Sequence, residues 1–307
     1  MFKWLAAGAA VVVAIPVLLL LLVSAAAVPS AAGTGLAGGP SALALSDIPP
    51  SYLVLYLDAA QTCPGLAWGV LAGIGKIESD HGRSDEPGVH SGANFAGAEG
   101  PMQFEPATFA AYAVKADSAS RLSVYDPADA IYTAAAMLCA NGAASGTRAW
   151  ISHAVFTYNH SHDYVAQVLA WAARYTTPTS PSAAATAITF ALRQLGKPYR
   201  WGATGPDAYD CSGLVYAAYA AAGIQIARTT FQWRFDGPQV PLSQIQPGDL
   251  LFSAGSDGTP ANPGHVVMYL GGGQIVQAPQ AGQDVQIDPL DLTGVVVATR
   301  PSDLPAS

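Results

Sequence analysis

Positively charged residues are scarce in this chain of 307 residues. It has 13 lysines and arginines against 21 aspartates and glutamates, which gives a net charge of −8 at pH 7. No stretch concentrates the basic side chains, although a surface that binds nucleic acid needs such a cluster to neutralise phosphates. The charge balance therefore argues against nucleic acid as a partner, and solubility is a sufficient reason for the acidity.

Charge is absent altogether from residues 5–28, a strongly apolar segment. The segment is long enough to cross a bilayer of about 30 Å as a helix. Lys3 and the terminal amine carry the nearby positive charge, so the residues that follow are expected on the outer side of the membrane. We therefore predict a single-pass anchor at 1–28 in the cell membrane, with the rest of the chain outside the cytoplasm. The alternative is a cleaved signal peptide and a secreted protein, with small residues at 24–28 for the peptidase.

Cysteine is the third scarcity, with three residues in the whole chain. Cys63 and Cys139 fall on predicted helices of one domain, whereas Cys211 lies in another domain. A pair of cysteines in an exported protein tends to be oxidised. We therefore predict a Cys63–Cys139 disulfide and a free Cys211. A free thiol outside the cell is a liability, which indicates that Cys211 has a chemical role.

Small residues and proline dominate 29–50 and 176–184, which we interpret as a flexible tether and a second linker. Between them, residues 51–175 have apolar side chains at helical spacing and no strand alternation, which predicts an all-α domain whose first helix begins at Pro64. Residues 185–307 begin with helices and continue with short β-type runs between glycines and prolines. That order predicts an α+β domain with an antiparallel sheet.

Cys211 lies where a loop rich in glycine and proline meets the start of a predicted helix. A helix N-terminus stabilises negative charge, so we expect a lowered thiol pKa and a thiolate nucleophile at neutral pH. Asp210 is expected to cap this helix or to contact substrate, and the sequence leaves both open. The base that such a nucleophile needs is His265, which opens an apolar run with the pattern of a strand.

The register of a predicted hairpin decides whether Gln277 can assist His265. If the three glycines at 271–273 form the turn, Val267 lies opposite Gln277. His265 and Val267 share a face because side chains alternate along a strand. Gln277 is then diagonal to His265, close enough to hydrogen-bond the imidazole and fix its tautomer.

Five motifs around these residues resemble the NlpC-type cell-wall cysteine peptidases, in the family's order and over about 183 to the C-terminus. They are Gly-Lys-Pro-Tyr at 196–199, Asp-Cys-Ser-Gly at 210–213, Arg-Thr-Thr at 228–230, Pro-Gly-Asp-Leu at 247–250 and Gly-His-Val at 264–266. The resemblance implies a papain-like core that cleaves peptide stems, commonly next to D-glutamate. Cys211 would be the nucleophile, His265 the base, Gln277 the orienting residue, and Tyr199 a group that helps hold the oxyanion. The third position is most often His in this family, but a neutral amide can still orient the base.

Glu78 lies on the first predicted helix of the all-α domain, one residue beyond its apolar stripe. A carboxyl against an apolar wall has its charged form disfavoured, so its pKa rises and it can donate a proton at neutral pH. A glutamate on a helix surface is usually only solvated, so this reading depends on the residues that follow it.

Gly-Pro-Met-Gln-Phe at 100–104 and Tyr158-Asn159 follow Glu78 as they do in the goose-lysozyme and soluble lytic transglycosylase superfamily. The similarity covers about 53–175 and implies a lysozyme-like fold. Glu78 would be the catalytic acid, and then the base, on the bond after N-acetylmuramic acid. Gln103 would line the sugar site, and Tyr158 and Asn159 would position Glu78 and the substrate.

The sequence is compatible with both hydrolysis and transglycosylation of the glycan strand. Most glycosidases use two carboxylates, for which Asp80, Asp85 and Glu86 are candidates. Lytic transglycosylases need one, because the 6-hydroxyl of the sugar replaces water and gives an anhydro product. We favour the transglycosylase.

The predicted partners are peptidoglycan as substrate and the membrane through the N-terminal segment, and no cofactor is predicted. His160 and His162 do not have the spacing of a zinc site, so we predict no metal. Two other functions remain open. The chain could be an inactive wall-binding scaffold of a wall-spanning secretion or conjugation complex, or a thiol-dependent acyltransferase.

Overall fold

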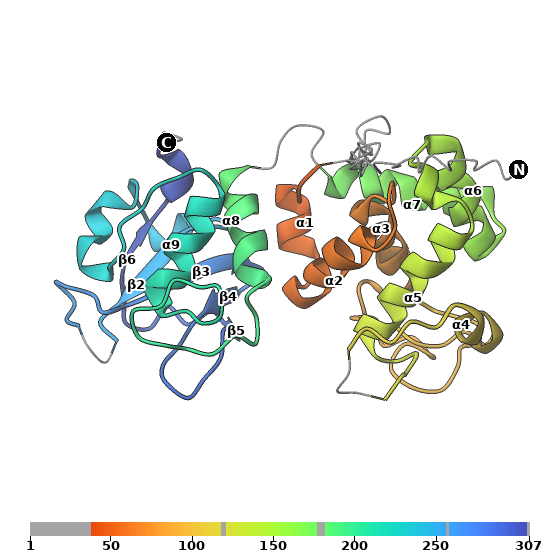
Figure 1. Ribbon diagram of the computed structural model, residues 1–307, viewed down its shortest axis with the longest axis horizontal. Coiled ribbons are helices and arrows are strands. Elements are labelled where there is room, and N and C mark those ends of the chain that lie inside the picture. The colour runs from red at the N-terminus through yellow and green to blue at the C-terminus, as the bar shows by residue number, and fades with distance from the viewer. Residues whose placement is uncertain (1–37, 118–120, 177–181, 256–257, 306–307) are drawn as a thin grey trace, which may run out of the picture.

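A computed structural model describes residues 38–117, 121–176, 182–255 and 258–305. Figure 1 shows two units side by side, one built of helices and the other of helices around a sheet. Within the described ranges, no helix combines the length and the apolar character needed to cross a bilayer. The anchor predicted at 1–28 lies outside these ranges.

The first unit is helical, as the sequence predicts. It contains α1 (Ala42–Asp47), α2 (Pro50–Gln61), α3 (Trp68–Ser79), α4 (Pro106–Tyr112), α5 (Pro127–Ala140), the short 3-10 helix η2 (Ala143–Ser145), α6 (Arg148–Asn159) and α7 (His162–Tyr175). Helix α3 is buried over most of its length and packs against α7. Gly73 permits this contact, because a Cβ atom there would lie 2.5 Å from the carbonyl oxygen of Val168.

Three local predictions for this unit are wrong. The first helix does not begin at Pro64, since helix α2 precedes it and Pro64 lies in the turn before α3. Cys63 lies in that turn rather than on a helix. The range 29–50 is not simply a tether, because its described part includes α1. The proline and small residues of this range have the composition of a linker. Ser41 nevertheless caps α1 by accepting a hydrogen bond from the backbone N–H of Ala44.

The predicted disulfide is confirmed. Cys63 and Cys139 are bonded, with their Cα atoms 5.6 Å apart, and Cys211 is a free, buried thiol. The bond joins the turn after α2 to the last turn of α5 across 76 residues of sequence. It therefore holds together two helices that are distant in the chain.

The second unit combines α-helices with an antiparallel sheet, which confirms the α+β prediction. Its helices are α8 (Ala183–Leu192), α9 (Cys211–Ala221), and the 3-10 helices η3 (Thr230–Phe235), η4 (Leu242–Gln244) and η5 (Pro301–Asp303). Its strands are β1 (Gln239–Val240), β2 (Leu250–Ser253), β3 (His265–Gly271), β4 (Gln274–Gln277), β5 (Gln286–Pro289) and β6 (Val295–Thr299), in the order β1-β6-β2-β3-β4-β5. The sequence did not predict β1 and β5, which are short and polar.

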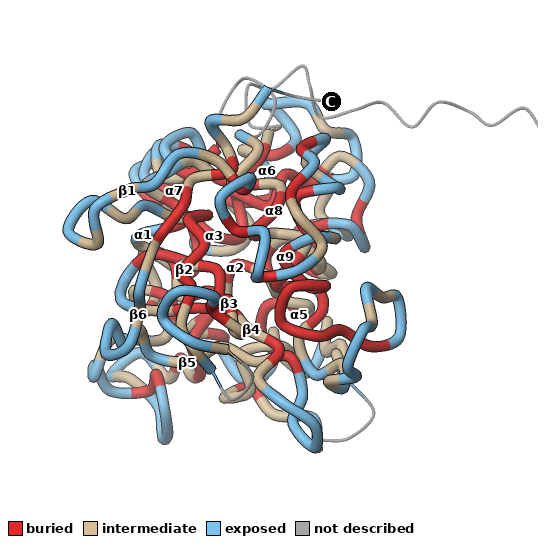
Figure 2. Tube along the Cα trace, turned by 90° about the vertical axis from the view of Figure 1, so that its left-hand side faces the viewer, coloured by how far each residue is buried: buried red, intermediate tan, exposed pale blue. Residues whose placement is uncertain are grey.

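Alternation along β3 places its residues in two cores. Val266, Met268 and Leu270 belong to the main core beneath α9, whereas Val267 belongs to a smaller cluster with Leu251 on the opposite face. Figure 2 shows buried residues gathered in the interior strands and helices, with the exposed residues in the outer loops. The sheet is therefore packed on both faces. This packing fixes the position of the end at which β3 begins.

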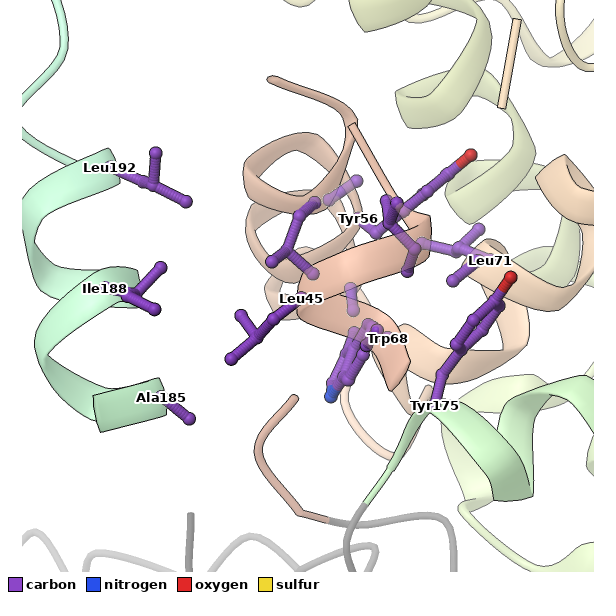
Figure 3. Packing of buried hydrophobic residues seen from close by; sticks show 14 of the residues in the cluster. Leu45, Tyr56, Trp68, Leu71, Tyr175, Ala185, Ile188 and Leu192 are labelled. Carbon is purple, nitrogen blue, oxygen red and sulfur yellow. The ribbon is translucent and has the colours of Figure 1, made fainter. Parts of the chain in front are cut away.

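Helix α1 lies at the edge of the first unit that faces the second (Figure 1). In Figure 3, Leu45 of α1 points toward Ala185, Ile188 and Leu192 of α8, and these side chains belong to one continuous cluster of buried residues. An ion pair between Arg193 and Asp58, with N and O atoms 3.1 Å apart, adds a polar contact across the same boundary. The units therefore share a packed interface in addition to their connection along the chain.

Candidate active sites

Glu78 lies near the end of α3, where the helix is held against the loop that carries Gln103. The hydroxyl of Ser79 donates to the carbonyl oxygen of Pro101 at 2.6 Å and accepts from the backbone N–H of Gly82 at 2.8 Å. Glu78 accepts a hydrogen bond from the hydroxyl of Tyr164 on α7. These contacts fix the carboxyl at the junction of three segments.

The environment of Glu78 disfavours its charged form. Burial raises the pKa of Glu78 to about 7, although the hydrogen bond from Tyr164 acts in the opposite direction. This agrees with the raised pKa that the sequence predicts for a carboxyl against an apolar wall. At neutral pH a substantial fraction of Glu78 is therefore protonated, as a general acid requires.

A buried chain of polar groups fixes the turn that follows α3. The Nδ1 atom of His81 is hydrogen-bonded to the Tyr56 hydroxyl and its Nε2 atom to the Tyr175 hydroxyl, both at 3.0 Å. Tyr175 donates to Asp47 of α1 at 2.5 Å. Burial lowers the pKa of His81 to about 3, so the ring is neutral. The end of the Glu78 helix is thus connected to α1 and the boundary between the units.

A cavity of about 320 Å³ brings together the three residues expected to bind sugar, Gln103, Tyr158 and Asn159. Glu78 is not among its lining residues. It is connected to the cavity through Tyr164, whose ring lies parallel to that of Tyr158 at a centroid distance of 6.4 Å. Tyr158 itself donates to the carbonyl oxygen of Met102 at 2.7 Å rather than to Glu78. The residue that positions the Glu78 carboxyl is therefore Tyr164, which the sequence analysis missed.

The amide of Gln103 is bonded at both ends. Its oxygen accepts from Asn94 Nδ2 at 2.9 Å, and its Nε2 donates to the carbonyl oxygen of Gly100 at 2.8 Å. The Asn94 side-chain oxygen accepts from the backbone N–H groups of Ala96 and Ala98, which also line the cavity. Asn94 therefore holds one wall of the cavity together, a role that its sequence position does not reveal.

Asp80, a candidate second carboxylate, is engaged in ion pairs. Lys76 and Arg83 approach its Oδ1 atom at 2.6 and 2.8 Å, and Arg83 also donates to Oδ2 at 3.0 Å. Burial raises the pKa of Asp80, but the hydrogen bonds from Arg83 and Lys76 outweigh it and the pKa is lowered. Asp85 and Glu86 are exposed.

The two histidines considered as metal ligands contact an aromatic ring. His160 and His162 both lie against Phe156, at centroid distances of 5.7 and 4.7 Å. Among the residues that the structure describes, no group of three or more His, Cys, Asp and Glu side chains is arranged to hold a metal ion.

The second site is built on Cys211, the first residue of α9. Asp210 caps the helix by accepting from the backbone N–H of Gly213 at 2.6 Å. The other carboxylate oxygen of Asp210 accepts from Arg228 at 2.9 Å and from the backbone N–H of Gly202 at 2.7 Å. Asp210 is thus a helix cap that also ties two neighbouring loops to the start of α9.

A pocket of about 210 Å³ opens beside the thiol. Its lining residues come from four parts of the second unit: Tyr199, Trp201, Cys211, Gly255, Gly264, His265, Pro279 and Gln280. Three of the predicted site residues, Tyr199, Cys211 and His265, therefore line one pocket. The Cys211 sulfur lies 3.9 Å from the carbonyl oxygen of Gly264, immediately before the histidine.

The predicted lowering of the Cys211 pKa is wrong for the site as it stands. Burial and the nearby Asp210 carboxylate raise the pKa of the thiol, and the backbone hydrogen bonds from Val266 and Ser212 only partly oppose them. Burial also lowers the pKa of His265, although its bond to Gln277 acts to raise it. The helix start was correctly located, but its stabilisation of negative charge is outweighed by removal of the thiol from water. The surroundings of the two groups therefore favour the neutral thiol and the neutral imidazole.

The hydrogen bond predicted between His265 and Gln277 is present. Strands β3 and β4 pair Met268 with Val276, as the predicted register requires, and the Nε2 of His265 donates to the Gln277 side-chain oxygen at 2.7 Å. Gly271 pairs with Gln274, so the three glycines at 271–273 do not all lie in the turn as predicted, and the ladder shifts between Tyr269 and Gly271. The irregularity lies at the turn and leaves the parity at the active end unchanged.

Two family models match the two units separately. The model described as the Transglycosylase SLT domain matches residues 56–180, and the model of the NlpC/P60 family matches residues 196–298. The first range contains Glu78 and its cavity, and the second contains Cys211, His265 and Gln277. A third model, a permuted papain-like amidase enzyme, matches residues 142–240 and so spans the junction of the units.

Curated relatives are similar to about a third of the chain. The murein DD-endopeptidase MepH of Escherichia coli is 40% identical over 103 residues, which cover 32% of this chain and 37% of the relative. The gamma-D-glutamyl-L-lysine dipeptidyl-peptidase of Bacillus subtilis is 39% identical over 93 residues, which cover 30% of this chain and 31% of the relative. The chain thus spans only about a third of the length of these relatives.

Among solved structures, the peptidoglycan hydrolase RipB of Mycobacterium tuberculosis is 33% identical. The match covers 39% of this chain and 64% of that chain, with a TM-score of 0.35. The family matches therefore give the order of the two regions, a transglycosylase SLT region followed by an NlpC/P60 region.

Proposed function

We propose that the chain cleaves peptidoglycan at two kinds of bond, the glycan strand through Glu78 and the stem peptide through Cys211 and His265. The observation that carries this proposal is the presence of two differently tuned sites in one chain. One has a carboxyl of raised pKa that Tyr164 connects to a cavity, and the other has a thiol and a histidine in a shared pocket. Each site falls within the corresponding family match.

At the first site, Glu78 donates its proton to the glycosidic oxygen after N-acetylmuramic acid as the C–O bond breaks. Tyr164 holds the carboxyl, while Gln103 and Asn159 line the cavity for the sugar. The Glu78 carboxylate then takes the proton from the 6-hydroxyl as that oxygen bonds to the anomeric carbon. The products are an anhydro-muramyl end and a new 4-hydroxyl end, and Glu78 is protonated again.

The transglycosylase reaction is favoured over hydrolysis by the surroundings of Glu78. A hydrolase of the usual kind needs a second carboxylate across the scissile bond. Asp80 is engaged with Lys76 and Arg83, so its oxygens are already neutralised by cations. A mechanism with one carboxyl requires no further acidic group.

At the second site, the Cys211 thiol gives its proton to His265 as the sulfur attacks the peptide carbonyl. Tyr199 lines the same pocket and is assigned to the oxyanion. His265 then gives the proton to the leaving amine, and water hydrolyses the thioester. The proposed bond lies next to D-glutamate in the stem peptide.

The proposed location is outside the cytoplasm, with residues 1–28 as a membrane anchor or as a cleaved signal. Fractionation of cells that produce the full chain, with mass determination of the mature N-terminus, separates these two outcomes. An inactive scaffold would be expected to associate with a wall-spanning secretion or conjugation complex.

Digestion of purified peptidoglycan, followed by mass spectrometry of the soluble fragments, tests the proposed function. We expect anhydro-muramyl ends together with new peptide termini at D-glutamate. Reducing muramyl ends in place of anhydro ends would indicate hydrolysis of the glycan. Intact peptidoglycan would contradict the proposal and favour a scaffold, and transfer of an acyl group to an added amine without wall cleavage would favour an acyltransferase.

A further inference from the structure

The side-chain amide of Gln277 is hydrogen-bonded at both ends, and the second partner is an acidic residue of β5. The Gln277 oxygen accepts from His265 Nε2 at 2.7 Å, and the Gln277 Nε2 donates to Asp288 Oδ2 at 2.7 Å. His265, Gln277 and Asp288 thus form a continuous chain of side chains that begins in the Cys211 pocket and ends on an outer strand of the sheet.

The position of Asp288 is itself fixed. Strand β5 pairs with β4 so that Ile275 lies opposite Asp288 and Gln277 lies opposite Gln286. The Nε2 of Gln286 donates to both carboxylate oxygens of Asp288, at 2.9 and 2.8 Å. Asp288 is therefore held on both sides by amide donors.

The chemistry of the three groups gives this series of hydrogen bonds a direction. A carboxylate only accepts hydrogen bonds, whereas an amide can present either its oxygen or its NH2 to a neighbour. Because Asp288 accepts, Gln277 must turn its NH2 toward Asp288 and its oxygen toward His265. The Nε2 of His265 must then carry the ring proton, which leaves Nδ1 free to accept a proton from the thiol.

We propose that Asp288 is a positioning residue of the peptidase site, which orients the Gln277 amide and thereby selects the His265 tautomer that can act as a base. The inference rests on the proposed peptidase function and deepens it. It also supplies a physical reason why a neutral amide can serve as the third residue. Without a fixed partner, Gln277 could turn and stabilise the opposite tautomer through its NH2.

Substitution Asp288→Asn tests the inference, because asparagine keeps the size of the side chain but can donate as well as accept. We expect kcat for stem-peptide cleavage to fall between roughly 10- and 100-fold, as for other groups that orient a functional histidine, with a smaller change in KM. Asp291→Asn, an exposed carboxylate in the loop after β5, is the matched control and should leave kcat unchanged.

The tautomer can be observed directly in protein labelled with 15N at histidine. The Nε2-protonated form of His265 should dominate in the wild type, and the Nδ1-protonated form should gain population in Asp288→Asn. In a Gln277→Ala background, Asp288→Asn should cost less than about twofold more, because the amide that connects the two residues is gone. Wild-type kcat together with an unchanged tautomer in Asp288→Asn would overturn the inference. A wild-type protein that cleaves no stem peptide would instead contradict the proposed function, and the tautomer would still test Asp288.

Discussion

The two sites use burial in opposite ways. At Glu78, removal of the carboxyl from water raises its pKa to about 7 and so produces the protonated acid that the reaction needs. At Cys211 and His265, the same effect raises the thiol pKa and lowers the imidazole pKa, which disfavours the charged pair. Burial alone therefore makes a general acid, whereas a thiolate needs a correctly oriented base beside it. This difference is consistent with a chain of orienting groups at the peptidase site and a single hydrogen bond, from Tyr164, to the carboxyl of Glu78.

The sites also differ in how their residues reach one another. His265 and Gln277 belong to neighbouring strands of one hairpin, only 12 residues apart. Glu78 and Tyr164 are separated by 86 residues and meet because α3 packs against α7. The contact at Glu78 therefore depends on the packing of the helical unit, whereas the contact between His265 and Gln277 depends on the local pairing of β3 with β4.

The largest expected effect separates the two activities completely. Glu78→Gln should abolish glycan cleavage and leave stem-peptide cleavage intact, because glutamine is nearly isosteric and has no proton to donate. Glu86→Gln makes the same chemical change at an exposed candidate for a second carboxylate, and the mechanism with one carboxyl predicts no effect. Chromatography of the muramyl ends measures glycan cleavage. Persistent glycan cleavage in Glu78→Gln would remove Glu78 from the mechanism.

The reciprocal change is Cys211→Ala, which should abolish stem-peptide cleavage and spare glycan cleavage. No other free thiol exists in the chain once Cys63 and Cys139 are bonded. His265→Ala should cost nearly as much, because neither the thiol nor the leaving amine then has a proton carrier. Residual peptide cleavage by Cys211→Ala would show that another group is the nucleophile.

Removal of the disulfide has the next largest expected effect, and that effect concerns the stability of the helical unit alone. Replacing both Cys63 and Cys139 with alanine should lower the free energy of unfolding of this unit by about 4 kcal/mol, given the loop of 76 residues. Urea unfolding measures the loss, and free-thiol titration of the unreduced wild type should detect one thiol. Detection of three thiols would show that the bond does not form.

A smaller effect is expected at Gln277, which orients a proton carrier and is not one itself. Gln277→Ala should reduce kcat for peptide cleavage less than His265→Ala, and Gln277→His should remain active. Gln274→Ala, at the other end of β4, is the matched control. If Gln277→Ala were as damaging as His265→Ala, Gln277 would have a direct chemical role that orientation does not explain.

The sequence predicted the features that depend on neighbours along the chain and missed those that depend on packing. The parity of the β3–β4 hairpin is local, so the bond between His265 and Gln277 could be predicted. Tyr164 could not be assigned to Glu78, because nothing in the sequence specifies which side of α7 meets α3. Asp288 lies on a strand with the sequence Gln-Ile-Asp-Pro, which has no strand signal by itself and forms through pairing with β4. The thiol pKa was predicted in the wrong direction, because the extent of its burial is a property of the folded unit.

The smallest change is a displacement of pH dependence. The Tyr164 hydrogen bond lowers the pKa of Glu78, so Tyr164→Phe should raise that pKa further. Glycan cleavage needs protonated Glu78, and its decline with rising pH should therefore begin at a higher pH in the variant. A pH profile of kcat/KM on soluble glycan strands measures this. A decline displaced to lower pH would mean that Tyr164 does not stabilise the carboxylate.

One chain thus holds two sites with opposite electrostatic requirements, a feature that can be tested in a single experiment. Its most direct test is a single series of peptidoglycan digests at increasing pH, in which anhydro-muramyl ends and new peptide termini are counted from the same samples. We expect glycan ends to decrease as the pH rises through about 7, where Glu78 loses its proton, while peptide termini do not decrease, because burial lowers the pKa of His265 and keeps the imidazole neutral and able to accept the thiol proton. If both products followed one pH curve, or if a single substitution at Glu78 or Cys211 removed both, the two-site account would be contradicted.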